Sequence, residues 1–153
     1  MRNHKLLGRS VTQHIFYCLN IVVPLIFGSA IYVCYRPDTY ISQFVYNTLG
    51  ISPNVGVFTD VLPAWVVSFI QNYLADILWA YSLTFTVYYI WRKQSSSSYE
   101  AFGIVIAFEF CIEFSQKPGI MSGTFDWIDI FLEVCITVLA TLLIKSHDKE
   151  SQI

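Results

Sequence analysis

Three apolar stretches of the sequence carry acidic and amide side chains at helical spacing. These side chains are Asn72 and Asp76 in the first stretch, Glu109, Glu113 and Gln116 in the second, and Asp126, Asp129 and Glu133 in the third. Intervals of three, four and seven residues place side chains on one face of a helix. Each stretch is therefore predicted to be a helix with one polar face, and an acidic pocket would form if the three faces met.

The residue types restrict the chemistry of such a pocket. All three histidines lie outside these stretches, and the four cysteines lie in apolar segments without a CxxC motif, so we predict neither a zinc site nor disulfides. An all-oxygen site suits Mg²⁺ or Ca²⁺, and no other cofactor is evident. The carboxylates could also bind a proton or a cationic or hydroxyl-rich ligand. Glu113 and Asp129 are the candidates for a catalytic acid/base pair.

The composition predicts that these helices lie in lipid. Of the 153 residues, 55% are hydrophobic and only 13% are charged, whereas about a quarter of the residues in soluble domains are charged. A soluble domain of this size could not bury so much apolar surface. A transmembrane helix needs about 20 mostly apolar residues, so four spans leave little chain for a second domain. We therefore expect residues 1–153 to form a single all-α membrane domain, a bundle of four transmembrane helices.

Apolar runs and their boundaries indicate where the four spans lie. They cover about residues 15–35, 73–91, 99–116 and 125–144. A polar tail at 145–153 follows the last span and is expected to be frayed.

The outer loop at 36–72 is expected to contain one or two short interfacial helices. The first is indicated by apolar residues at helical spacing, namely Ile41, Phe44, Val45 and Leu49. A loop helix that covers the bundle would show the same spacing. Residues 61–71 are also largely apolar, and they could be re-entrant, interfacial or part of the second span.

The basic residues predict the orientation. With both termini in the cytoplasm, seven of the nine Lys and Arg residues fall on the cytoplasmic side, and only Arg36 and Lys117 fall on the outer side. This distribution obeys the positive-inside rule at every loop. The acidic pocket candidates lie toward the outer side. We therefore expect an integral protein of the bacterial plasma membrane with an outward-facing acidic pocket.

The acids are predicted to form two layers. From the 1.5 Å rise per residue, Asp76, Glu113 and Asp129 lie roughly 21–23 Å above the inner helix ends. Glu109 and Glu133 lie roughly 15–17 Å above them. An ionisable group at such depth costs on the order of 3 kcal/mol on permissive insertion scales, which makes the set a candidate for function. The alternative is that these groups are protonated or hydrogen-bonded packing elements.

The second half of the chain resembles a known family. An E-x-x-Q sequence, Glu113 to Gln116, is followed by a short loop and then by Gly123-Thr124-Phe125-Asp126-Trp127-Ile128-Asp129. This pattern is similar to the signature of VanZ-like membrane proteins, over about residues 72–140. Glu133 and Ile136 depart from it, because the family often has Asn and Gly there. The resemblance implies an envelope role linked to glycopeptide antibiotics, and it supplies no reaction.

The leading hypothesis is an envelope membrane protein whose pocket binds a polar group of a cell-surface glycan, a lipid or a glycopeptide antibiotic. The expected partners are membrane lipid and a glycan or lipid-linked ligand; nucleic acid is not expected, and the oligomeric state is left open. One alternative is a membrane enzyme that acts on a lipid-linked substrate through Glu113 and Asp129. Others are cation- or proton-coupled transport through Glu109 and Glu133, or an accessory subunit of a membrane complex. Transport ranks lower, because the spans below these two residues are almost wholly apolar.

Overall fold

Every regular element in the described part of the chain is a helix. The computed structural model describes residues 2–37, 39–50, 62–92, 98–118 and 125–152. The helices are α1 (Arg2–Tyr35), α2 (Tyr40–Leu49), α3 (Ala64–Phe69), the π-helical segment η1 (Ile70–Leu74), α4 (Ala75–Trp91), α5 (Ser98–Gln116) and α6 (Trp127–Gln152). No strand occurs in these ranges, which confirms the all-α prediction. Residues 38 and 51–61 of the predicted outer loop, together with Gly123 and Thr124 of the resemblance, lie outside the described residues.

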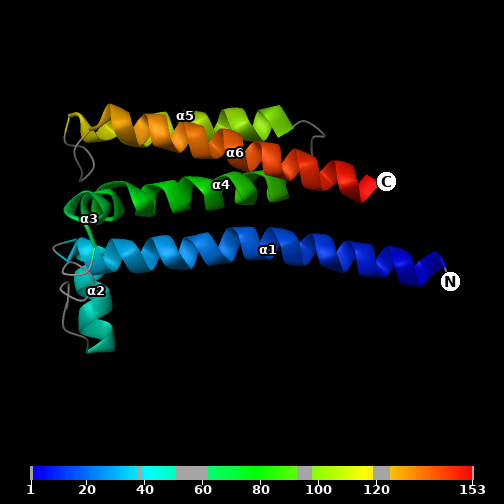
Figure 1. Cartoon of the computed structure of the whole chain (residues 1–153), viewed down its shortest axis with the longest axis horizontal. Helices are drawn as coiled ribbons and strands as arrows, with labels where there is room; N and C mark the ends of the chain where they lie inside the picture. The colour runs from blue at the N-terminus through cyan, green and yellow to red at the C-terminus, as the bar shows by residue number, and fades with distance from the viewer. Residues whose placement is uncertain (1, 38, 51–61, 93–97, 119–124, 153) are drawn as a thin grey trace.

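Four helices, α1, α4, α5 and α6, run along the long axis of the molecule (Figure 1). Both chain termini lie at one end, which we call the terminal end, and α2 and α3 lie at the other, the distal end. The central helix is α4, because α1 packs against one side of it and α5 and α6 pack against the other. This arrangement lets α4 line any cavity that forms between the other three helices.

Two of these helices contain segments long and apolar enough to cross a membrane. They are Val11–Tyr35 of α1, with a mean hydropathy of 1.9, and Trp127–Lys149 of α6, with a mean hydropathy of 2.2. α4 and α5 do not contain such a segment. α4 is too short, with 17 residues, and α5 carries too many charged residues, with three glutamates. Length and composition thus support two of the four expected spans.

The helices at the terminal end extend further than predicted. α1 already begins at Arg2, and α6 continues to Gln152, so the tail that was expected to be frayed is helical. The physical reason lies in Asp148, whose carboxylate accepts hydrogen bonds from the hydroxyls of Tyr17 and Tyr88. These two contacts hold the last turns of α6 against α1 and α4.

α3 continues into α4 through η1 without a break in the helical chain. In Figure 1, α3 is seen nearly end-on where α4 is seen from the side, so the chain changes direction around η1. Residues 64–71 of the segment 61–71 therefore belong to the same helical run as the second expected span. They form its beginning, up to the bend at η1. Single π-helical turns of this kind occur frequently at functional sites.

α2 is the short helix that the apolar spacing predicted, and it stands at an angle to the bundle (Figure 1). It starts after Thr39, whose hydroxyl accepts a hydrogen bond from the Ser42 backbone N–H. Gly50, with a positive φ of 64°, caps its end after Leu49. Phe44 and Leu49 are 70% and 61% exposed. The bundle therefore does not cover the apolar face of α2.

An apolar cluster is buried between helices on the terminal side of the bundle. It consists of Tyr17 from α1, Phe85 from α4, and Ala140 and Ile144 from α6, all of them buried. We call this group the apolar plug. It joins three helices, α1, α4 and α6.

Candidate functional site

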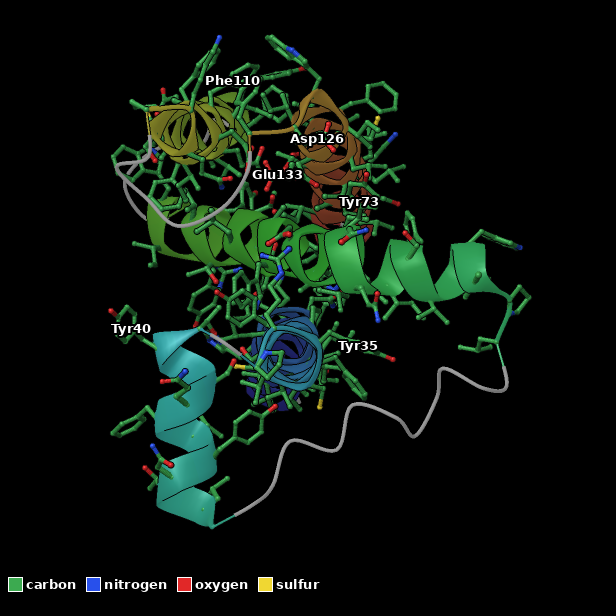
Figure 2. The ribbon with its side chains drawn as sticks, turned by 90° about the vertical axis from the view of Figure 1, so that its left-hand side faces the viewer. Tyr35, Tyr40, Tyr73, Phe110, Asp126 and Glu133 are labelled. Carbon is green, nitrogen blue, oxygen red and sulfur yellow. The ribbon has the colours of Figure 1, made fainter. Side chains whose placement is uncertain are left out.

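One cavity on the distal side of the apolar plug collects the acidic side chains. Its volume is about 1110 Å³, and its walls come mainly from α1, η1, α4, α5 and α6. All seven pocket candidates from the sequence line it, namely Asp76, Glu109, Glu113, Gln116, Asp126, Asp129 and Glu133. Figure 2, viewed from the distal end, shows Glu133 between α4, α5 and α6. The three polar helix faces therefore meet around one space, comparable in size with the about 300–1,000 Å³ of small-molecule sites.

Glu109 occupies a buried position on α5, where α6 supplies its hydrogen-bond partner. The side chain is 4% exposed, and Thr137 donates its hydroxyl hydrogen to Glu109 Oε1 across an O–O distance of 2.8 Å. Thr84 of α4 donates in turn to Thr137 at 3.4 Å. The sequence-based prediction missed Thr137. Its position four residues after Glu133, on the same face of α6, could have identified it.

Glu113 and Asp126 are oriented by neighbours near the distal end. Gln116 Nε2 donates to Glu113 Oε1 at 3.0 Å, so the first and last residues of the E-x-x-Q sequence contact each other within one helix turn. Asp126 Oδ1 accepts a hydrogen bond from the backbone N–H of Ile128 at 2.9 Å and thereby caps the start of α6. Its other oxygen lies 3.4 Å from the hydroxyl of Tyr73, which donates to it.

Arg36 is the one basic side chain among the described residues that line the cavity. Its Nη2 donates to Asp76 Oδ2 at 3.2 Å and to the backbone carbonyl of Asn72 at 3.1 Å. These bonds tie the end of α1 to η1 and to the first turn of α4. Arg36 thus compensates Asp76, and the other carboxylates of the cavity lack a basic side chain of their own.

Four carboxylates each keep one buried oxygen without a hydrogen-bond partner among the described residues. The atoms are Glu109 Oε2, Glu113 Oε2, Asp129 Oδ1 and Glu133 Oε2. The carboxylates also lie close enough to interact electrostatically, since Asp129 is repelled by Asp76 and Glu113 and Glu133 is repelled by Glu109. Buried acceptors without partners and neighbouring like charges both destabilise a folded protein. The indole N–H of Trp79, which also lines the cavity, is likewise buried without a partner. A ligand with N–H or O–H donors would satisfy the four oxygens, and a ligand acceptor would satisfy the indole.

Aromatic side chains share the cavity wall with the acids. No group of three or more His, Cys, Asp or Glu side chains in the described ranges is arranged to hold a metal. Tyr32, Tyr73 and Trp79 line the cavity beside the acids, and aromatic faces bind organic cations and sugar rings. The prediction also missed Trp79, whose position three residues after Asp76 on the same helix face could have identified it.

The ion pair between Arg36 and Asp76 leads to a prediction about stability. Replacing Arg36 with Gln is expected to lower the free energy of unfolding by about 1 kcal/mol, because the ion pair with Asp76 is only partly buried. A thermal-unfolding double-mutant cycle with Asp76→Asn measures the coupling, and Lys117→Gln at the same end serves as the control. Strictly additive effects of the two substitutions would show that the pair does not contribute.

Comparison with protein-family models, with curated proteins and with solved structures found no match.

Proposed function

We propose that the chain is an integral membrane protein in which α1, α4, α5 and α6 all cross the bilayer. Large apolar side chains on the outer faces support this, since Phe27 is 60% exposed, Phe131 66% and Leu142 56%. Exposed apolar patches of this extent mark contact with a membrane or a partner. α4 gains spanning length from η1, which directly precedes it, and α2 lies in the interface with its apolar face in the lipid.

In this proposal the terminal end faces the cytoplasm of a bacterial cell. The positive-inside distribution of Lys and Arg supports this orientation, and both termini lie at the same end of the bundle (Figure 1). The distal end, with the cavity residues Arg36 and Asp126, then faces outward.

The orientation predicts the accessibility of two exposed positions. In a variant whose four cysteines are replaced by serine, Asn47→Cys on α2 is expected to react with a membrane-impermeant maleimide on intact cells. Ser146→Cys near the end of α6 is expected to react only after permeabilisation. The reverse pattern would overturn the orientation, and labelling of both positions on intact cells would contradict the spanning topology.

We infer that the outward-facing cavity binds a polar group of an envelope ligand, which is a glycan, a lipid or a glycopeptide antibiotic. The observation that carries this inference is the set of four buried carboxylate oxygens without partners in one cavity. Protein packing alone gives no reason to retain them, because each destabilises the fold. The resemblance of residues 72–140 to VanZ-like proteins supports an envelope setting for the ligand.

The proposal is tested by the compounds that co-purify with the protein. Wild-type protein and the variant Glu113→Gln/Asp129→Asn are isolated in the same neutral detergent, and their organic extracts are compared by mass spectrometry. We expect at least one envelope compound to be enriched several-fold in the wild-type extract. Glu100→Gln, an exposed glutamate on the same helix, is the matched control and should behave as wild type. Identical extracts from all three proteins would sink the proposal.

An enzyme acting on a lipid-linked substrate is the second candidate. The hydrogen bond from Gln116 to Glu113 favours this enzyme, because the bond holds the Glu113 carboxylate in place. Glu113 Oε2 and Asp129 Oδ1 stay without partners among the described residues. An acid/base pair needs two such groups within reach of one substrate. In this case Glu113→Gln and Asp129→Asn would each abolish turnover of the co-purified compound, and full activity in both variants would exclude the mechanism.

Coupled transport is less well supported. It requires a polar path from the cavity to the terminal end, and Thr137 and Thr141 extend such a path below Glu109. The apolar plug with Phe85 and Ile144 then interrupts it. A cavity without a polar path to the terminal end agrees better with binding than with transport.

A further inference from the structure

The acidic cavity continues into an apolar groove along α4. The groove is lined by Leu25 of α1, Leu83 of α4, and Phe108 and Ile112 of α5. Leu25 and Phe108 are 46% and 52% exposed, so this part of the cavity opens at the side of the bundle. Over the described ranges, α1 and α5 pack against α4 rather than against each other. In a bilayer, the side opening faces the acyl chains of the lipid.

The polar end of the same cavity requires donors and positive charge. Glu109 and Glu113 are 4% and 5% exposed, and each keeps a buried oxygen without a partner. Arg36, the basic residue of the described wall, already binds Asp76. A primary ammonium carries a positive charge and three N–H donors, as the lysine side chain does. A hydroxyl has a donor without the charge, and a quaternary ammonium has the charge without a donor.

We propose that the occupant of this cavity is a lipid with a primary-amine head group and no anionic group. Its ammonium binds the free oxygens of Glu109, Glu113 and Glu133, and its hydrocarbon chain lies in the groove between α1 and α5. A phosphate beside the amine would meet the same carboxylates, which repel it. This inference rests on the proposed binding function and specifies the class of ligand.

The proposal is tested with a series of simple probes. Binding of n-dodecylamine to the purified protein in a neutral maltoside detergent is measured by thermal shift and by titration of tryptophan fluorescence, since Trp79 lines the cavity. Dodecanol and dodecyltrimethylammonium test the charge and the N–H donors separately. Butylamine tests the groove, and lysophosphatidylethanolamine tests the exclusion of phosphate.

We expect dodecylamine to bind at least tenfold more tightly than dodecanol, dodecyltrimethylammonium or lysophosphatidylethanolamine. Butylamine should bind at least a hundredfold more weakly, because it lacks most of the apolar chain. Glu109→Gln/Glu113→Gln should weaken dodecylamine at least tenfold, and Glu100→Gln should not. Both variants are checked for folding by circular dichroism, and the probe series on wild-type protein is independent of them.

Two results would overturn the inference. One is equal binding of dodecylamine and dodecyltrimethylammonium, which would reflect a general attraction of cations to the micelle or the surface. The other is tighter binding of dodecanol or of the phospholipid. If a co-purified envelope compound without an amine depends on Glu113 and Asp129, the binding function stands while the amine inference fails. If neither probe nor extract shows binding, both fail.

Discussion

Substitution of Glu133 by glutamine is expected to raise the melting temperature of the ligand-free protein. Glu133 carries a buried oxygen without a partner and is repelled by four neighbouring carboxylates, among them Glu109 and Glu113. Glutamine keeps the shape and removes the charge, and its N–H groups can donate to the neighbouring oxygens. The gain should be on the order of 1–3 kcal/mol, the penalty of a buried unsatisfied group. Differential scanning fluorimetry in detergent should show about 2–4 °C per kcal/mol.

The matched control is Asp148→Asn, which changes a carboxylate to an amide at the other end of the molecule. Asp148 accepts hydrogen bonds from Tyr17 and Tyr88, so this substitution weakens two charge-assisted bonds and should lower stability by about 1–3 kcal/mol. The two substitutions are thus expected to change stability in opposite directions. This difference distinguishes a carboxylate of a binding site from one that makes a structural contact. If Glu133→Gln destabilised the protein as much as Asp148→Asn, the cavity acids would be packing elements.

Replacement of Gly28 by alanine is expected to destabilise the bundle. Gly28 is buried where α1 crosses α4, and a Cβ atom there would lie 2.8 Å from Trp79 Cδ1 and 3.2 Å from the carbonyl oxygen of Ala75. The backbone carbonyl cannot give way without a shift of α4. Overpacking of this kind costs about 1–3 kcal/mol, and it should also weaken ligand binding, because Trp79 lines the cavity.

Gly103→Ala on α5 is the control for this substitution. Gly103 is exposed, and a Cβ there meets nothing within 4 Å, so alanine should be neutral or stabilising through its higher helix propensity. Thermal unfolding of both variants in one detergent compares the two positions. Adding Trp79→Phe to Gly28→Ala should recover part of the loss. Equal melting temperatures for Gly28→Ala and Gly103→Ala would show that the helices do not meet closely at Gly28.

Features that depend on one helix at a time could be predicted from the sequence. The spacing of Phe44 and Leu49 predicted α2, and the intervals among the acids predicted which side chains share a helix face, because helical periodicity is a local property. The end of α6 could not be predicted in this way. Lys145 to Gln152 reads as a polar tail until the hydroxyls of Tyr17 and Tyr88 are placed beside Asp148.

The partners within the site were the least predictable part. The sequence shows an arginine at position 36 and an aspartate at position 76, but their pairing depends on how α1 approaches α4. Thr137 likewise looks like an ordinary residue of an apolar span until it is placed beside Glu109 of another helix. The acids themselves were easier to identify, because a carboxylate in an apolar stretch is costly in any fold.

The central position of α4 has a consequence for the order in which the protein can assemble. α1, which contains Asn20, enters the bilayer first in the proposed topology. Tyr81, whose hydroxyl donates to the Asn20 side chain, lies 61 residues later in the chain. At about 5–20 residues per second, ribosomal synthesis needs several seconds to reach it. During that interval α1 has no helix to dock on. The cavity comes into existence last, because its walls are incomplete until α6 joins α4 and α5.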